Sequence, residues 1–393
     1  MVFLLVIIYI TFISLGLPDA LLGSGWPSMY QELGVPIASA GIVSMIVSGG
    51  TILSSFISGK VINKFGVALT TSVSVAMTAI ALLGFSFSGH FYLLCLWAVP
   101  LGLGAGAVDS ALNNFVALHY EAKHMNWLHC FWGVGASISP LIMSFSLGKW
   151  QLWHRGYQIV GIIQVALAIL LFATLPMWKK ATNGNAQGEG MTKKHLNIKE
   201  LLALPEAKKI LLALFCYCAI EATVGLWGSS FLVTVRGIDA GTAASWIAIY
   251  YAGITIGRFL SGILAIKFNS QQLIQIGLTL ITLGVAILFM PIPDIMLLVG
   301  LFFIGLGCAP IYPSVLHETP NNFGSENSQT MMGIQMGCAY IGITFMPPLF
   351  GLIASKTGYR TFPYFLGILL LVMVLMIGSA EGKTDKSNEN KFG

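Results

Sequence analysis

Charged residues are scarce in this chain. Only 9% of its 393 residues are Asp, Glu, Lys or Arg, whereas soluble domains carry roughly 25%. A soluble globule of this length needs a charged surface that so few ionisable residues cannot supply. With 56% apolar residues and a mean hydropathy of +0.82, the composition also excludes a disordered chain and a secreted disulfide scaffold. It indicates an integral membrane protein.

Cysteine is scarce too, and its placement argues against redox or metal chemistry. All six cysteines lie inside apolar segments, and Cys216 and Cys218 are two positions apart, which does not fit a C-x-x-C pair. We expect them to be small packing residues. The sequence also shows no phosphate-binding lysine motif, no metal-ligand pattern and no hydrolytic triad. The chain is therefore predicted not to be an enzyme and to use no cofactor.

What the chain does have is twelve long apolar stretches. A helix of about 20 apolar residues crosses the hydrocarbon core of a bilayer. The stretches are continuous and do not alternate with a period of two, so helices are favoured over a membrane barrel. They cover residues 2–30, 37–61, 67–87, 91–118, 126–148, 154–177, 207–235, 240–266, 270–290, 295–317, 328–354 and 360–379. The predicted fold is an all-α membrane protein with 12 transmembrane helices.

A polar, glycine-rich segment separates six of these helices from the other six. We predict a six-helix bundle over 1–178, a linker over 179–206, a second bundle over 207–380 and a tail over 381–393. Basic residues tend to stay on the cytoplasmic side of a membrane. With the N-terminus inside, fourteen of the 20 Lys and Arg residues fall on inner segments and five on outer ones. The sequence thus predicts a multi-pass cell-membrane protein with both termini cytoplasmic and no nucleic-acid partner.

The two halves of the sequence are weakly similar to each other. FISGKVINKFG at 56–66 aligns with FLSGILAIKFN at 259–269 at an offset of 203. The same offset aligns the GLG at 102–104 with the GLG at 305–307. Parallel repeats of this kind occur in transporters and are related by an axis along the membrane normal. The twelve helices are therefore predicted to form two parallel six-helix pseudo-repeats.

The loop after the second predicted helix carries a signature-like motif. SGKVINKFG is similar to the Gly-x-x-x-Asp/Asn-basic-x-Gly signature of the major facilitator superfamily, although one downstream basic residue is missing. The matching residues are Gly59, Asn63, Lys64, Phe65 and Gly66. With the helix number and the repeat, the chain resembles that superfamily over nearly its whole length. The resemblance implies a monomeric carrier that works by alternating access of two bundles.

Three further segments resemble the fucose-permease-like branch of sugar:proton symporters. They are GLGAGAVDSALNNF at 102–115, IEATVGLW at 220–227 leading to IGRFLSG, and GCAPIYPS at 307–314. Asp109 departs from that pattern, which often has Glu or Thr at this position. The resemblance implies inward, proton-coupled symport of a small polar solute, a hexose or related sugar, with sodium left open as the coupling ion. Two alternatives are a proton-coupled exporter of amphipathic compounds or drugs and a transport-inactive sensor.

Three carboxylates lie inside predicted helices: Asp19, Asp109 and Glu221. An ionised carboxylate in the bilayer is energetically costly, and binding a proton removes that cost. We predict that Asp109 takes up the coupling proton, with Asp19 sharing the proton or binding substrate hydroxyls. Glu221 is a third candidate for both roles. The alternative for each residue is a helix cap or a polar pair that joins two helices.

Amide and aromatic side chains near these carboxylates are candidates to bind a sugar. Asn113 lies one helical turn after Asp109, and its amide suits hydroxyl groups. Trp26 and Trp227 follow Asp19 and Glu221 by seven and six residues, and indole faces pack well on sugar rings. Each could instead only join helices. The remaining candidates are Tyr312, at the repeat position of Asp109, Gln164 and Gln335; Trp132 and Trp246 also lie in membrane segments.

Arg258 lies well inside a predicted helix, whereas the other 19 Lys and Arg residues lie at helix ends, in loops or in the tail. It lies near the inner end of the eighth helix, where we expect it to pair with a carboxylate or carbonyl at a cytoplasmic gate. Glu318 and Glu326, in the loop after the tenth helix, are the candidate partners. The sequence alone does not show which of these two carboxylates pairs with Arg258.

Overall fold

The computed structural model describes residues 2–119, 122–182, 198–290 and 293–389. In these ranges its regular structure is helical, and 12 helical segments are long and apolar enough to cross a membrane. The predicted all-α class and number of spans are confirmed. The bounds are α1 Val2–Asp19, α2 Leu21–Glu32, η1 Ile37–Ser39, α3 Ala40–Phe65, α4 Val67–Ser86, α5 Phe91–His119, α6 Ala122–Trp150, α7 Trp153–Ala173, α8 Leu175–Thr182, α9 Ile198–Ala203, α10 Pro205–Arg236, α11 Ala240–Leu264, α12 Ser270–Phe289, α13 Ile295–His317, α14 Thr319–Phe323, α15 Ser325–Thr357, η2 Tyr359–Thr361 and α16 Phe362–Glu389.

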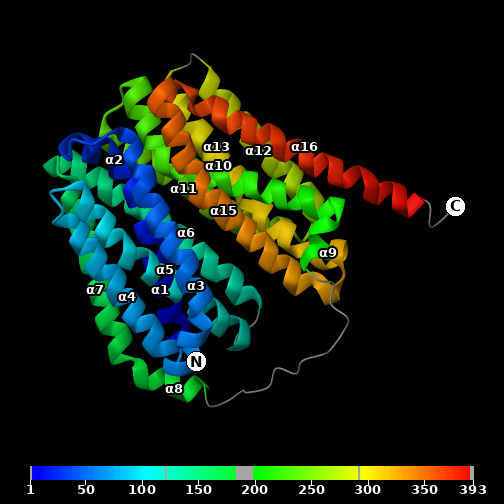
Figure 1. The fold of residues 1–393 in the computed structure, drawn as a ribbon, viewed down its shortest axis with the longest axis horizontal. Helices are drawn as coiled ribbons and strands as arrows, with labels where there is room; N and C mark the ends of the chain where they lie inside the picture. The colour runs from blue at the N-terminus through cyan, green and yellow to red at the C-terminus, as the bar shows by residue number, and fades with distance from the viewer. Residues whose placement is uncertain (1, 120–121, 183–197, 291–292, 390–393) are drawn as a thin grey trace.

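The helices form two bundles, α1–α8 and α9–α16 (Figure 1). In the first bundle α3 and α4 pack on α5, and α1 packs on α6; in the second α11 and α12 pack on α13, and α10 packs on α15. The predicted linker contains α9, while residues 183–197 lie outside the described part. Helix α16 continues to Glu389, so the segment predicted as a solvated tail begins as part of a helix.

The closest helix contacts repeat between the bundles at the offset of 203. A Cβ atom at Gly102 would lie 2.2 Å from the Val47 carbonyl oxygen, and one at Gly305 would lie 2.1 Å from the Tyr250 carbonyl oxygen. Tyr250 is the repeat position of Val47. Because only glycine lets the two backbones approach so closely, α3 on α5 and α11 on α13 are built in the same way. The predicted parallel pseudo-repeat is confirmed at the level of packing.

The two bundles contact each other tightly at one end of the molecule. A Cβ atom at Gly23 of α2 would lie 2.1 Å from the Gly225 carbonyl oxygen of α10. A Cβ atom at Gly41 of α3 would lie 2.8 Å from the Cα of Pro348 in α15. At this end the small residues therefore hold the bundles together, backbone against backbone.

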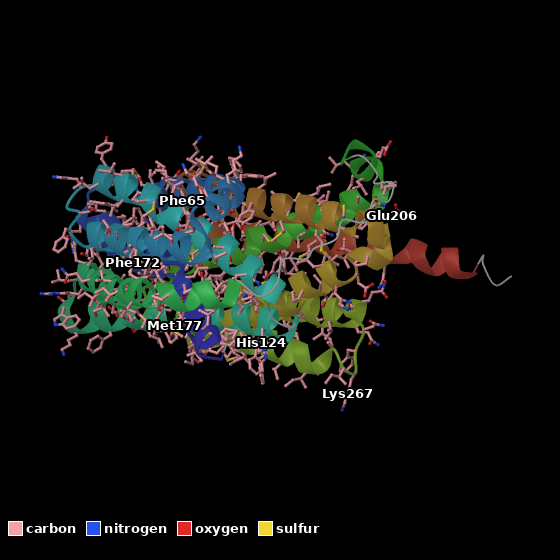
Figure 2. The ribbon with its side chains drawn as sticks, turned by 90° about the horizontal axis from the view of Figure 1, so that it is seen from below. Phe65, His124, Phe172, Met177, Glu206 and Lys267 are labelled. Carbon is pink, nitrogen blue, oxygen red and sulfur yellow. The ribbon has the colours of Figure 1, made fainter. Side chains whose placement is uncertain are left out.

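At the other end, which carries α8, α9 and the N-terminus and is here called the linker end, the bundles diverge (Figure 1). Figure 2 shows this end, with Phe65 and Met177 of the first bundle lying apart from Glu206 and Lys267 of the second. The structure thus captures a state in which the bundles are joined at the end opposite the linker.

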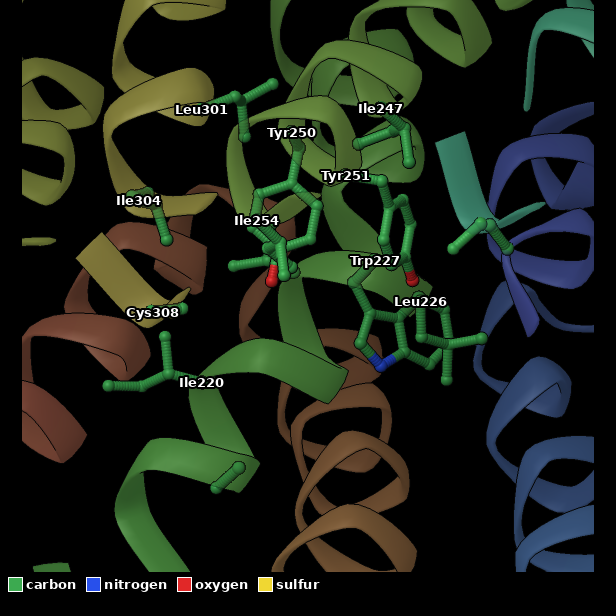
Figure 3. Packing of buried hydrophobic residues seen from close by; sticks show 14 of the residues in the cluster. Ile220, Leu226, Trp227, Ile247, Tyr250, Tyr251, Ile254, Leu301, Ile304 and Cys308 are labelled. Atoms are coloured by element: carbon green, nitrogen blue, oxygen red, sulfur yellow. The ribbon is translucent and has the colours of Figure 1, made fainter. Parts of the chain in front are cut away.

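One large apolar core runs through both bundles, and each bundle also has a smaller cluster of its own. In the second bundle Tyr250 and Ile254 of α11 pack towards Ile304 and Cys308 of α13, and all four are buried (Figure 3). The six cysteines are free thiols, and Cys216, Cys218 and Cys308 are buried. They pack as small apolar residues, as the sequence predicts.

Candidate functional site

The first span is broken next to a carboxylate. The sequence predicts one helix over 2–30, whereas the structure has α1 and α2 with a turn at Ala20 between them. Pro18 has no N–H, so the helix ladder is interrupted just before Asp19. The Asp19 carboxylate accepts a hydrogen bond of 2.7 Å from the indole N–H of Trp132 in α6. Asp19 is exposed although it lies within a membrane span.

Gln164 has a packing role next to this break. Its side-chain amide donates to the carbonyl oxygen of Ser14, the group to which the residue at position 18 would donate if it had an N–H. Gln164 is only 1% exposed. The structure therefore does not place it among the carboxylates as a substrate ligand, and it acts as a polar contact between α1 and α7.

The second carboxylate, Asp109 of α5, lies on the same helix face as Asn113, as predicted. The Asn113 amide donates to the Asp109 carboxylate at 2.8 Å and to its backbone oxygen at 3.0 Å. Asp109 and Asp19 are within electrostatic range of each other. In the described part of the chain no Lys, Arg or His side chain lies within ion-pair distance of either carboxylate. The first bundle therefore presents two negative groups without a compensating cation.

The third carboxylate, Glu221 of α10, forms an ion pair with Arg258 of α11. The closest nitrogen and oxygen are 3.7 Å apart, and the side chains are 18% and 19% exposed. The Tyr217 hydroxyl donates to the same carboxylate, and the Tyr250 hydroxyl donates to the Glu221 backbone oxygen at 3.1 Å. The partner of Arg258 is therefore Glu221 in the neighbouring helix.

This pairing corrects the expected pairing of Arg258 with the loop after α13. The Glu318 carboxylate instead accepts a hydrogen bond of 3.0 Å from the Asn321 amide and lies 3.8 Å from the His317 ring. Partial burial acts to raise the pKa of Glu318, but hydrogen bonds from Asn321 and Ser270 and the adjacent His317 outweigh it, and the pKa lies below its ordinary value. The side chain of Glu326 lies outside the described part.

Arg258 also joins the two bundles. Its guanidinium carbon lies 4.9 Å from the centre of the Trp132 ring system, a cation–π distance. Trp132 in turn bonds Asp19, so a continuous chain of contacts runs from Asp19 through Trp132 and Arg258 to Glu221. We call these four residues, with Asp109 and Asn113, the central cluster. Sequence reasoning placed Trp132 in a membrane segment but did not select it, because nothing in its local spacing connects it to Asp19.

Tyrosines of the second bundle lie beside this cluster, on the side of Glu221. The ring of Tyr312, predicted from its repeat position, stacks on Tyr217 with centroids 6.3 Å apart. Tyr312 and Tyr340 both lie within electrostatic range of Asp109 across the interface. Tyr312 therefore reaches the central cluster through Tyr217, which donates to Glu221. Tyr217 and Tyr340 carry no sequence signal that marks them.

Three other predicted ligands do not reach the cluster. The indole N–H of Trp26 donates to the Ile37 carbonyl at 2.6 Å, and that of Trp227 donates to the Pro347 carbonyl at 2.7 Å. Both side chains are completely buried, as is Gln335, which accepts from the Thr319 hydroxyl. In this structure all three side chains lie in helix packing, which was the alternative role left open for them.

The signature loop closes α3 with a conformation that requires glycine. Gly66 has φ of +81° and donates its N–H to the Ile62 carbonyl at 2.7 Å. A side chain would strain this left-handed backbone. Beside it the Lys64 ammonium lies 5.2 Å from the Phe65 ring centre. The surroundings of Gly59 and the side chain of Asn63 lie outside the described part.

The sequence matches the family model described as Major Facilitator Superfamily over residues 8–317 and 210–392. The chain belongs to the Major Facilitator Superfamily. It is therefore a multi-pass membrane protein of a transporter family, and the superfamily fold predicted from the sequence is confirmed.

The chain is also similar to individual proteins, and these carry different names. It is 22% identical to Bypass of stop codon protein 6 of Saccharomyces cerevisiae over 397 residues, 93% of this chain and 80% of that protein. It is 23% identical to the glucose/mannose transporter GlcP of Bacillus subtilis over 314 residues, 78% of this chain and 77% of that protein. The fold matches a bacterial homolog of the human lysosomal transporter Spinster, solved inward-facing and unoccupied, with a TM-score of 0.76, 14% identity and coverage of 96% and 95%.

Proposed function

We propose that this carrier couples proton movement to the inward symport of a small polar solute, a hexose or related sugar, by alternating access. The observation that carries the proposal is the central cluster itself. It combines three carboxylates and one guanidinium inside membrane spans, where charges are costly and are retained for transport. It also lies where the two bundles meet, so a change of charge there affects contacts between them.

The proton is assigned to the first bundle. Asp19 and Asp109 have no cation at ion-pair distance in the described part of the chain, whereas Glu221 is compensated by Arg258. Neutralising an unpaired carboxylate removes the cost of carrying its charge through a closed state, but neutralising Glu221 would leave Arg258 unpaired. We therefore assign proton exchange to Asp109 with Asp19, and a counter-ion role to Glu221.

The same side chains suit a sugar. Carboxylate and amide oxygens accept hydrogen bonds from hydroxyls, and Asp19 and Asn113 supply both types at the bundle interface. Trp132, Tyr217 and Tyr312 add aromatic faces for the C–H face of a pyranose ring. The name of one relative, the glucose/mannose transporter GlcP, supports this class of substrate.

The direction of transport follows from an orientation that we also propose. Basic residues concentrate on the segments at the linker end, so this end is assigned to the cytoplasm. The bundles would then be joined on the outside and separated on the inside, in the state that releases solute into the cell. We propose a monomer that needs no cofactor beyond the proton gradient.

The test is the external pH of de-energised vesicles that contain the purified protein. Adding sugars one at a time should cause alkalinisation with the transported sugar, and Asp109→Asn should abolish it. Glu32→Gln is the matched control, because Glu32 is a carboxylate that bonds Trp153 at the end opposite the linker. Equal alkalinisation in Asp109→Asn and the wild type would contradict the proton assignment.

The same assay separates the rival function. If no sugar changes the external pH, and lipophilic cations cause acidification or dye efflux, the proposal would be replaced by a proton-coupled exporter of amphipathic compounds. Sugar uptake that requires sodium, causes no alkalinisation and persists with a protonophore would assign the coupling ion to sodium.

A further inference from the structure

A pocket at the end opposite the linker lies on the second bundle, away from the central cluster. It encloses about 330 Å³ between α10, α12 and α16 and is lined by Arg236, Leu288, Phe289, Met290, Arg360 and Tyr364, among others. Two spans end here, at Arg236 and Phe289, and a third begins at Tyr359. The pocket therefore lies at the boundary between the hydrocarbon core and the lipid headgroups.

The polar side of this pocket is positively charged. Arg236 donates to the Met290 carbonyl at 3.1 Å and lies 3.9 Å from the half-exposed Asp294. The side chain of Arg360 makes no hydrogen bond or ion pair within the described part of the chain. Arg236 thus has N–H groups that make no hydrogen bond in the described structure, and none of the side-chain N–H groups of Arg360 makes one there. Guanidinium groups match the oxygens of a phosphate in geometry and in charge.

The remaining side of the pocket is apolar and faces outward. The rings of Phe289 and Tyr364 meet edge to face with centroids 4.8 Å apart. Phe289 is 44% exposed and Tyr364 is 62% exposed. In a membrane this wall faces acyl chains. A soluble phosphate compound would contact only the arginines and would leave this wall unused.

We propose that this pocket binds one anionic phospholipid, with the phosphate on Arg236 and Arg360 and an acyl chain along Phe289 and Tyr364. The two arginines hold the phosphate, and the aromatic wall orients the chain. This lipid site is independent of the transported solute and of the proton.

The experiment is native mass spectrometry of the purified protein titrated with phosphatidylglycerol. Arg360→Gln should weaken binding of the first lipid by about tenfold, because it removes one charge-assisted contact. Arg155→Gln is the matched control, since Arg155 is an exposed arginine near the same membrane boundary whose side chain, among the described residues, bonds Gln158 alone. Because Arg360 bonds nothing in the described structure, its substitution should not impair folding. Tyr364→Ala, at an exposed position, tests the apolar wall separately and should also weaken binding.

Three outcomes would overturn the lipid site. The first is equal binding by Arg360→Gln and Arg155→Gln. The second is equal affinity for phosphatidylcholine, which would show that the arginines do not select negative charge. The third is displacement of the lipid by glycerophosphoglycerol at the same concentration, which would show that a headgroup without acyl chains is sufficient.

Discussion

The two bundles share a scaffold and differ in charge. Gly102 meets Val47 in the first bundle just as Gly305 meets Tyr250 in the second, so the helices that carry the central cluster are packed alike. Among the residues that the structure describes, no cation pairs with Asp19 or Asp109 in the first bundle, whereas Glu221 in the second is paired with Arg258.

This difference gives equivalent parts of one fold a different electrostatic character. An unpaired carboxylate becomes easier to carry through the membrane when it is protonated, whereas a paired one is already neutral as a unit. Tyr312 replaces Asp109 at the repeat position, so the second bundle supplies a neutral hydroxyl where the first supplies a charge. The two halves thus share their packing and differ in the charge that they hold at the centre.

The largest effect is expected from removing the unpaired charge. Asp109→Asn should abolish uphill accumulation of the solute, because the site no longer changes charge, while exchange of solute across the membrane continues. Counterflow with labelled solute measures exchange, and accumulation under an imposed pH gradient measures coupling. If accumulation persists, the two bundles do not differ in the way described above.

Breaking the pair in the second bundle should lower stability. Arg258→Gln leaves Glu221 without its cation in a mostly buried site, which costs about 3–5 kcal/mol. Thermal unfolding in detergent measures this loss. The double variant Arg258→Gln/Glu221→Gln should recover most of the lost stability. Asp109→Asn should cause no such loss, because Asp109 forms no ion pair in the described structure. A single and a double variant of equal stability would contradict the ion pair.

The shared scaffold predicts matched losses in the two halves. Gly102→Ala and Gly305→Ala each place a Cβ atom within 2.2 Å of a backbone oxygen in the neighbouring helix, so each should cost about 1–3 kcal/mol. Gly49→Ala is the control, because nothing lies within 4 Å of a Cβ atom there. Thermal unfolding of the three variants compares them, and a loss in only one half would break the equivalence.

The smallest effect concerns the contact between the halves. Trp132→Phe keeps a ring for Arg258 but removes the N–H that bonds Asp19. We expect about 1 kcal/mol weaker solute binding, since this hydrogen bond is exposed. The half-saturation concentration of transport measures it. Trp246→Phe, at another membrane tryptophan, should leave that concentration unchanged.

Local spacing predicted the parts of the cluster that lie on one helix. Asn113 bonds Asp109 because residues four apart share a helix face. The same reasoning failed for Trp26, since the turn at Ala20 interrupts the helix between it and Asp19 and its indole bonds Ile37. For Gln164 the sequence left two roles open, substrate contact or helix joining, and could not name its partner, because the Ser14 carbonyl released by Pro18 is 150 residues away.

The sequence by itself determined the twelve spans, the two-bundle repeat and the carboxylates inside the membrane, because a bilayer imposes length and apolarity on each helix separately. Only the tertiary structure decided which charges meet. Arg258 pairs with Glu221 and stacks on Trp132 because α10, α11 and α6 converge, and that convergence depends on backbone contacts between small residues far apart in the chain. Pairing in a membrane is a property of packed helices, and no single helix encodes it.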